Sequence, residues 1–226
     1  MSVLKVMPIE GDFEVNAAAQ KSYGEVLSEL VISKSLSDLH AGVRSSTEGF
    51  VRLLSCHVVR GAYPSRLRQL WEKFDREKGS ENEHPRLFLA GQLFLVLEYS
   101  HAGQDLEHFQ FSDVDQAIAA FMQIAFSLAV AETELEFEHR DLHWGNVLLR
   151  AEPAPSVDGV LRGRRYGLPS AGVRATLIDF TLSRLRVDGA VVYNNLAEDP
   201  TLFTAHGDHQ FEVYRQMRTA TQDQWR

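Results

Sequence analysis

The stretch His139-Arg140-Asp141-Leu142-His143-Trp144-Gly145-Asn146 is the most informative segment of this chain, and it runs directly into the apolar residues Val147-Leu148-Leu149. It places Asp141 five residues before Asn146. A carboxylate can accept the proton of an attacking hydroxyl, and an amide oxygen suits a hard cation such as Mg²⁺. His-Arg-Asp followed by four residues and Asn is a catalytic-loop pattern of phosphoryl transfer. The segment therefore predicts Asp141 as a catalytic base and Asn146 as a metal ligand, followed by a strand.

A second carboxylate falls at the end of another predicted strand. The apolar run Ala175-Thr176-Leu177-Ile178 ends at Asp179, which precedes Phe180 and Thr181. This order matches the Asp-Phe-Gly metal-binding pattern, with Thr181 in place of Gly. Asp179 follows the catalytic segment at a long separation, which the Pro-, Gly-, Ser- and Arg-rich connection at residues 151–172 explains. We expect Asp179 to bind Mg²⁺ and, through it, the phosphates of ATP.

Two further charges complete the set that phosphoryl transfer needs. Lys5, in the predicted strand Val3-Leu4-Lys5-Val6, stands where a lysine holds the α- and β-phosphates. Glu29 lies on the first predicted helix, where the partner of that lysine belongs. Either residue alone is more often a solvated surface charge. Beside the catalytic segment, the two predict a phosphate-positioning ion pair.

A zinc site is the main rival interpretation of the catalytic segment. His139 and His143 are four residues apart, as in the zinc motif His-Glu-x-x-His. That motif needs Glu in its second position, where this chain has Arg140. We therefore interpret His139 as a structural residue that organises the loop.

The composition is that of an ordinary folded protein, with 44% hydrophobic and 24% charged residues. The net charge of −8 argues against direct nucleic-acid binding through a broad basic face, and it suits a basic partner. The single cysteine, Cys56, cannot form an internal disulfide and is predicted to be buried. The N-terminus shows no apolar signal segment, and the stretch from Ala119 to Val130 is too short to span a bilayer. These features predict a cytoplasmic or nuclear protein without a membrane partner.

The order of predicted elements indicates an α+β fold with two lobes. Residues 1–99 are predicted to form part of a small β-rich lobe with one helix, and residues 100–226 part of a larger, mostly helical lobe. The predicted apolar face of the first main helix is given by Tyr23, Leu27, Leu30 and Val31, with Leu36 and Leu39 further on. That of the second is given by Ile118, Phe121, Ala125 and Leu128. No G-x-G-x-x-G occurs, and only four residues precede Lys5. We therefore expect a fold that is incomplete at both ends.

Several segments together resemble the haspin family of protein kinases, over nearly the whole chain. They are Glu138 to Leu149, Ile178-Asp179-Phe180-Thr181-Leu182-Ser183-Arg184-Leu185, Ile32-Ser33-Lys34, Thr47-Glu48-Gly49-Phe50, Ser127 to Glu132 and Gln210-Phe211. The resemblance implies an ATP- and Mg²⁺-dependent serine/threonine kinase, a monomer of the nucleus or chromosome with the cytoplasm as alternative. It further implies a threonine of the basic N-terminal tail of histone H3 as the substrate.

The resemblance also implies roles for residues that the spacing alone does not assign. Glu98, Tyr99, Ser100 and His101 fall at the hinge that meets adenine, and Asp105 falls where the ribose is held. Asp199 and Asp208 fall in the region that contacts the substrate tail. The chain departs from the family pattern at Ser100, His101 and Thr201, where an acidic, an aromatic and an acidic residue are expected.

Two alternatives remain open from the residues. A small-molecule kinase of the aminoglycoside or choline type shares the Asp-x-x-x-x-Asn loop, although Arg140, Trp144 and the segment Thr181-Leu182-Ser183-Arg184 are untypical of that class. A truncated or degenerate kinase-fold fragment without activity would keep the same motifs. Phosphotransfer and nucleotide-binding assays separate these alternatives.

Overall fold

The computed structural model describes residues 1–207 and 209–226, and the chain falls into two compact units. The first comprises Met1–Leu27 and Leu53–Tyr99, and the second comprises Ser28–Arg52 and Ser100–Arg226. One boundary between the units, between Tyr99 and Ser100, falls within the residues predicted as a hinge. Residues 28–52 differ from the sequence-based division, because they group with the second unit. Their contacts explain this grouping, since the N–H of Val51 donates to the carbonyl of Leu177 at 3.1 Å.

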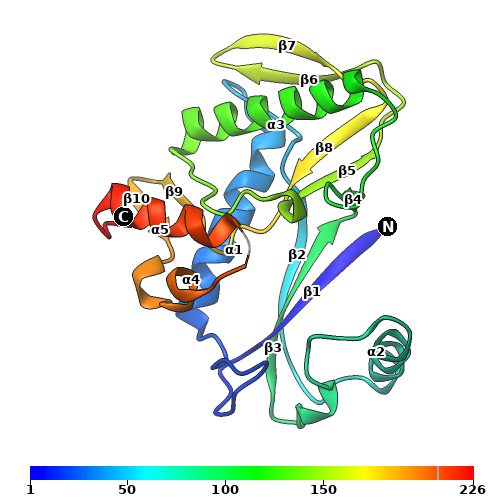
Figure 1. The fold of residues 1–226 in the computed structure, drawn as a ribbon, viewed down its shortest axis with the longest axis vertical. Coiled ribbons are helices and arrows are strands. Elements are labelled where there is room, and N and C mark those ends of the chain that lie inside the picture. Colours follow the sequence, from blue (N-terminus) through cyan, green and yellow to red (C-terminus); the bar gives the residue numbers. More distant parts are fainter. Residues whose placement is uncertain (208) are drawn as a thin grey trace. The chain divides into compact units, whose positions relative to one another are not determined.

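The first unit is built on a three-stranded sheet in the order β1–β3–β2 (Figure 1). Its strands are β1 (Ser2–Ile9), β2 (Leu53–Arg60) and β3 (Leu93–Ser100), and its helical elements are α2 (Ser65–Lys78) and the 3₁₀ turn η2 (Pro85–Leu87). Phe88 and Phe94 pack edge to face with ring centroids 5.1 Å apart. Cys56 lies opposite Leu97 on β2 and is exposed, so the prediction of a buried cysteine was wrong. Most of β2 is exposed, and an apolar run therefore did not indicate burial here.

Helix α1 (Tyr23–Asp38) confirms the predicted element and part of its predicted apolar face. Leu36 and Leu39 are buried as predicted, whereas Tyr23 and Leu27 are 48% and 56% exposed. The other buried residues of the helix are Val26, Glu29, Ile32, Ser33 and Ser37. Hydropathy misplaced the start of the buried face because this face carries a carboxylate and two hydroxyls. A polar buried face is more typical of a functional position than of simple core packing.

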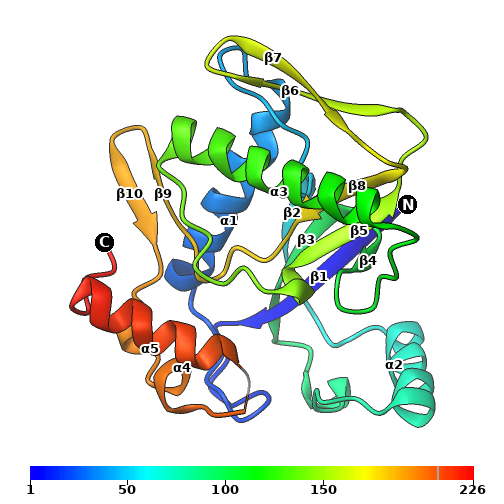
Figure 2. The ribbon, with the colours of Figure 1, turned by 45° about the horizontal axis from the view of Figure 1, so that its top comes forward.

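The centre of the second unit is a three-stranded antiparallel sheet in the order β4–β5–β8. Its strands are β4 (Gln104–Asp105), β5 (Val147–Ala151) and β8 (Val173–Leu177), and the long helix α3 (Val114–Leu135) packs against β8 (Figure 2). Asp113 caps α3 by accepting the N–H of Gln116 at 2.9 Å. The core between helix and sheet contains Ala120, Leu149, Val173 and Ala175. The connection at residues 151–172 forms the hairpin of β6 (Ser156–Leu161) and β7 (Arg164–Pro169).

Helix α3 also turns a different face inward than the one predicted. Ile118 and Phe121 are 51% and 70% exposed, whereas the buried positions are Ala119, Ala120, Gln123, Ser127, Val130 and Ala131. Gln123 makes this inward face specific, because its amide donates to Val173 O at 3.0 Å and accepts from Ala175 N at 2.9 Å. By length and composition alone the 22-residue helix could cross a membrane, which corrects the shorter span read from the sequence. Core helices of soluble proteins meet the same criterion.

The remaining elements of the second unit follow Asp179. They are the hairpin of β9 (Arg184–Val187) and β10 (Ala190–Tyr193), the turn η4 (Leu196–Glu198), and helices α4 (Thr201–Thr204) and α5 (His209–Thr221). Two further 3₁₀ turns are η1 (Leu39–Ala41) and η3 (Trp144–Asn146). Leu196, Phe203, Tyr214 and Trp225 form a second core cluster. This C-terminal cluster fixes α5 and the end of the chain beside the catalytic segment, as the contacts below show.

Candidate functional site

The catalytic segment forms a compact loop that ends in η3 and β5. The side-chain amide of Asn146 donates to the backbone carbonyl of Asp141 at 2.9 Å, and it lies 3.4 Å from Asp141 Oδ2. The carbonyl of Asn146 accepts the N–H of Ile178 at 3.1 Å, which ties the loop to the end of β8. With its Nδ2 engaged in this way, Asn146 has its amide oxygen available for a cation.

The segment after Phe180 holds the start of the loop through hydrogen bonds. The hydroxyl of Ser183 donates to the carbonyl of His139 at 2.9 Å. Arg184 and Glu138 exchange both backbone hydrogen bonds, at 2.9 and 2.8 Å. These contacts give a physical reason for the Thr-Leu-Ser-Arg sequence that follows Asp179-Phe180. Its polar side chains and backbone brace the loop that carries Asp141.

His139 is a buried structural residue, as the sequence indicated. Its Nε2 lies 3.2 Å from the carbonyl of Ile178, and its ring packs edge to face on Phe180. Burial lowers the pKa of His139, and the nearby carboxylates of Asp141 and Asp179 only partly oppose this effect. The neutral ring therefore donates from Nε2. Its Nδ1 is buried without a hydrogen-bond partner among the described residues.

Asp179 adopts a left-handed backbone conformation, with φ at 57°. Such a conformation costs about 1–2 kcal/mol for a residue other than glycine and is often found at functional sites. Thr181 stabilises it, because both its N–H and its hydroxyl lie within hydrogen-bonding distance of Asp179 Oδ1, at 3.2 and 2.7 Å. The same hydroxyl lies 3.3 Å from Oε2 of the buried Glu29. Thr181 thus links the residue predicted to bind metal to the residue predicted to pair with Lys5.

Asp141 and Asp179 both act electrostatically on the same two residues of the second unit. Both carboxylates contribute to raising the pKa of Tyr214, after the larger effect of burial. Both also act on the pKa of His139. A carboxylate and an amide oxygen are the ligand types that Mg²⁺ prefers, so Asp179 and Asn146 have the chemistry to hold this ion. Their role as metal ligands and the role of Asp141 as a base stay predictions.

His143 faces Asp141 with a defined tautomer. The N–H of Gly145 donates to His143 Nδ1 at 3.1 Å, so this nitrogen carries no proton. The proton of the neutral ring is then on Nε2, which lies 4.0 Å from Asp141 Oδ1. The same oxygen accepts a hydrogen bond from the hydroxyl of Tyr214. Oδ1 of Asp141 thus has the Tyr214 hydroxyl as a hydrogen-bond donor, and the His143 ring lies near it without a hydrogen bond.

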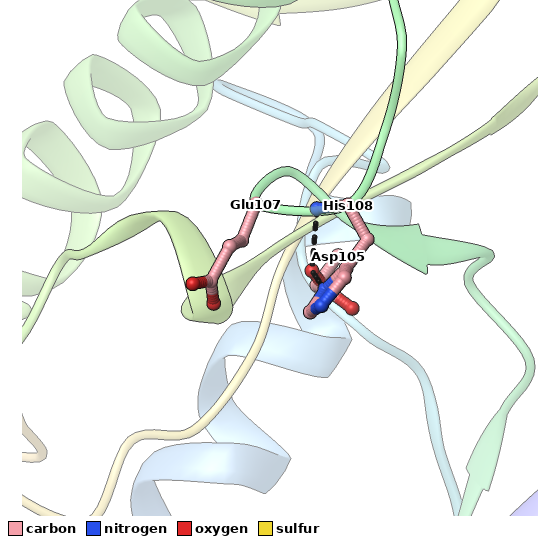
Figure 3. Close-up of side chains that lie close together, drawn as sticks. All are labelled: Asp105, Glu107 and His108. Carbon is pink, nitrogen blue, oxygen red and sulfur yellow. Dashed lines mark hydrogen bonds and ion pairs between the residues drawn. The ribbon is translucent and has the colours of Figure 1, made fainter.

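Asp105, the predicted ribose contact, belongs to a small polar group with Glu107 and His108 (Figure 3). Asp105 Oδ1 accepts from the backbone N–H of His108 at 3.0 Å and lies 2.6 Å from His108 Nδ1. The side-chain hydrogen bond between His108 and Asp105 lowers the pKa of Asp105 and raises the pKa of His108. The group has ligand types that a metal could use, but exposed groups of this kind are common without one.

The predicted hinge residues lie at the end of β3 and just beyond it. The hydroxyls of Ser2 and Ser55 donate to Glu98 and lower its pKa. Ser100 is held by its N–H, which donates to the carbonyl of Arg52 at 2.9 Å. His101 is exposed, and Tyr99 is half-buried at the end of the first unit. Their contact with adenine stays a prediction.

Lys5 lies on β1 of the first unit, and Glu29 lies in the second. Glu29 is only 2% exposed, so its carboxylate is a buried charge of the kind that needs a cation or donor as partner. The ion pair between these residues stays a prediction.

The two predicted substrate contacts are in the C-terminal region. Asp199 is exposed and accepts hydrogen bonds from the N–H of Thr201 at 3.0 Å and from its hydroxyl. It therefore also caps the short helix α4. Asp208 lies outside the described residues. Substrate contact at both positions stays a prediction.

Two residues of the site were missed in the sequence. The hydroxyl of Tyr214, on α5, donates to Asp141. The guanidinium of Arg140 donates to the backbone carbonyl of Trp225 at 2.7 Å. The residues lie 73 and 85 positions from their partners. No local spacing could have indicated these contacts.

Comparison with known proteins agrees with this geometry. The family model described as "Haspin like kinase domain" matches residues 1–226. The chain is 42% identical over 223 residues to the serine/threonine-protein kinase haspin homolog of Drosophila melanogaster, covering 99% of this chain and 39% of that protein. It is 45% identical over 224 residues to serine/threonine-protein kinase haspin of Bos taurus, covering 98% and 29%. A haspin homolog of Arabidopsis thaliana is 37% identical over 228 residues, covering 99% and 38%.

The α+β fold and the matched family model are those of the protein kinase class. Within that class, the chain belongs to the haspin-like kinase family. It spans 29–39% of the length of these curated relatives.

Proposed function

We propose that this protein is an ATP-dependent serine/threonine kinase that transfers the γ-phosphate to a threonine in the N-terminal tail of histone H3. The observation that carries the kinase part is the convergence of Asp141 and Asp179 around a loop fixed by Asn146. The histone part rests on the family resemblance and on charge. The protein carries a net charge of −8, which favours encounter with a basic tail.

Each residue of the site has a distinct task in the proposed reaction. Asp179 and Asn146 would hold Mg²⁺, which neutralises charge on the phosphates when bound. Lys5, oriented by Glu29, would bind the phosphates as a point charge. Asp141 would accept the proton of the threonine hydroxyl as the new bond to phosphorus forms and the bond to ADP breaks. Orientation and charge, rather than covalent catalysis, would provide most of the rate.

Residues outside the catalytic loop would bind the adenine, the ribose and the substrate tail. We propose that residues 98–101 contact adenine and that Asp105 binds the ribose. Asp199 and Asp208 would contact basic residues of the tail. We also propose that the protein acts in the nucleus, as a monomer that uses ATP and Mg²⁺ and contacts neither nucleic acid nor a membrane directly.

A phosphotransfer assay tests the proposal. Full-length protein should phosphorylate an H3 N-terminal peptide and should leave an acidic peptide and amino alcohols such as choline unmodified. Asp141→Asn, a near-isostere, should lower the rate by roughly 10²–10⁴-fold, the usual contribution of a general base. Transfer to an amino alcohol instead of the peptide would replace the protein substrate with a small molecule. Nucleotide binding without any transfer would indicate a degenerate kinase.

The histone assignment has a separate test. Asp199→Lys should raise the KM for the H3 peptide far more than the KM for ATP, because the change reverses a charge only on the peptide side. Raising the salt concentration should also weaken peptide use, since contacts of this kind are screened within about 10 Å at 0.1 M salt. Equal use of an acidic peptide would remove the histone assignment and leave the kinase assignment in place.

A further inference from the structure

Tyr214 connects the C-terminal cluster to the catalytic loop. Its hydroxyl donates a hydrogen bond to Oδ1 of Asp141, across 73 residues of sequence. The side chain is only 4% exposed and packs within the cluster of Leu196, Phe203 and Trp225. A phenol held by a packed cluster has a fixed position. The hydrogen bond therefore acts on Asp141 as a rigid contact.

The two oxygens of Asp141 have different surroundings. Oδ1 accepts from Tyr214 and lies 4.0 Å from Nε2 of His143. Oδ2 has the side-chain amide of Asn146 at 3.4 Å, a long contact for a hydrogen bond. Oδ2 is therefore the oxygen with capacity to accept a proton from a substrate hydroxyl.

The chemical state of Tyr214 suits a permanent donor. Burial raises its pKa, and the charge and hydrogen bond of Asp141 raise it further. The phenol therefore stays protonated across the range in which the enzyme would work. Because it holds its own proton firmly, it can orient the carboxylate without competing for the substrate's proton.

We propose that Tyr214 is a positioning residue for the catalytic base: it holds Asp141 by Oδ1 so that Oδ2 faces the attacking hydroxyl. The inference rests on the function proposed above. A carboxylate turns easily about its last side-chain bond, because that torsion has broad minima. One strong, fixed donor on one oxygen restricts this rotation, and the effect is greatest in a buried site.

The opposite interpretation makes a different prediction. If Tyr214 occupied the place of the substrate hydroxyl, it would block the base, and its removal would raise the rate. The separation of the two oxygens favours positioning, since Tyr214 is on Oδ1 and Oδ2 remains accessible to substrate.

The test compares Tyr214→Phe with wild type in full-length protein, using H3 peptide and Mg²⁺-ATP. Phe keeps the ring and loses only the hydroxyl, so the C-terminal cluster should stay packed. We expect kcat to fall by about ten- to a hundredfold, within the range for a misplaced catalytic group, while both KM values change by less than about twofold. The matched control is Tyr193→Phe, because Tyr193 packs against the same cluster and has no hydrogen bond to Asp141. Its kcat should equal that of wild type.

A double-variant cycle separates failure of this inference from failure of the proposed function. In the Asp141→Asn background, Tyr214→Phe should have no further effect on kcat, because there is no base to position. If Asp141→Asn loses activity while Tyr214→Phe retains the wild-type kcat or exceeds it, the positioning role is refuted and the kinase assignment stands. An equal loss from Tyr214→Phe in both backgrounds would show a purely structural effect and would also refute it. If Asp141→Asn itself keeps full activity, the proposed base is wrong.

Discussion

Thr181 binds Asp179 through two groups, its backbone N–H at 3.2 Å and its hydroxyl at 2.7 Å. Kinases of the common type have glycine at this position. Glycine would adopt the turn freely but would offer no hydroxyl. In this chain the side chain instead stabilises Asp179 at its left-handed φ and also contacts Glu29. Threonine in place of glycine thus fixes the carboxylate that is predicted to bind metal.

Thr181→Val should weaken Mg²⁺-ATP binding. Valine keeps the branched shape but removes the hydroxyl, so Asp179 loses the 2.7 Å hydrogen bond and the 3.3 Å contact with Glu29 is also lost. We expect a loss of stability of about 1–3 kcal/mol, which is typical when one hydrogen bond to a charged group is removed. Thr181→Ser keeps the hydroxyl and serves as the control. Titration calorimetry and thermal unfolding measure both effects, and equal behaviour of the two variants would contradict the role of the hydroxyl.

Removal of the two predicted metal ligands should have unequal effects. Asp179→Ala removes a negative charge from the cation, whereas Asn146→Ala removes a neutral oxygen. We therefore expect the larger loss of Mg²⁺ affinity from Asp179→Ala. Asn146→Ala should also disturb the loop, because it removes the 2.9 Å hydrogen bond to the carbonyl of Asp141. Mn²⁺ binding followed by electron paramagnetic resonance would show the order directly, and the reverse order would mean that the two roles are misassigned.

The pair Asp105–His108 should depend on pH in a defined window. Its hydrogen bond raises the pKa of His108 above the ordinary 6.5 and lowers the pKa of Asp105 below the ordinary 3.8. The contribution of His108 to stability is therefore present below its unfolded pKa and is lost as pH rises through its raised folded pKa. The contribution of Asp105 is present above its unfolded pKa and is lost as pH falls through its lowered folded pKa. The ion pair stabilises the turn only between these limits.

An NMR titration of the His108 ring checks this prediction. In wild type the midpoint should lie above 6.5, and in Asp105→Asn it should move down toward that value. Glu107→Gln is the control, because Glu107 gives only the smallest of the effects that raise the pKa. An Asp105→Asn midpoint no lower than that of wild type would show that the hydrogen bond is not formed in solution.

Gly103, just after the hinge, should tolerate no side chain. Its φ is +110°, and a Cβ there would lie 2.0 Å from the carbonyl oxygen of Leu149. Gly103→Ala should therefore destabilise the second unit by more than the roughly 1–2 kcal/mol of a left-handed backbone alone. Gly163→Ala is the matched control, since Gly163 has φ +79° and open space around it. Urea unfolding of the two variants separates the cost of the steric clash from the cost of the left-handed backbone. Similar unfolding midpoints would contradict the clash between a Cβ at position 103 and the carbonyl of Leu149.

The catalytic loop could be predicted from sequence because its chemistry is local. Asp141 and Asn146 lie within one short segment, and the length of the loop is fixed by the hydrogen bond that joins them. Asp179 could be predicted because it ends a strand of clear composition. The main strands and the long helices were also predicted correctly in type, whereas the hairpin of β9 and β10 was not predicted.

What the sequence could not indicate depends on contacts between distant segments. The inner faces of α1 and α3 carry Glu29 and Gln123, so hydropathy misplaced the start of the buried face of α1 and selected an exposed face of α3. Cys56 lies on a strand that is mostly exposed, against the usual behaviour of cysteine. Tyr214 looks like any aromatic residue on a helix face, and only the folded chain brings its hydroxyl to Asp141.

The contact between Arg140 and Trp225 has a consequence for how the chain is made. Arg140 has a left-handed φ of 66°, and its guanidinium reaches the carbonyl and the ring of Trp225, 85 residues later. A ribosome adds about 5–20 residues per second, so several seconds pass between synthesis of the loop and synthesis of its support. During that interval the segment that carries Asp141 lacks its contact with Trp225. Hydrogen exchange on nascent chains stalled before Trp225 should accordingly find the backbone around Arg140 open, and the same amides should be protected once Trp225 has left the ribosome.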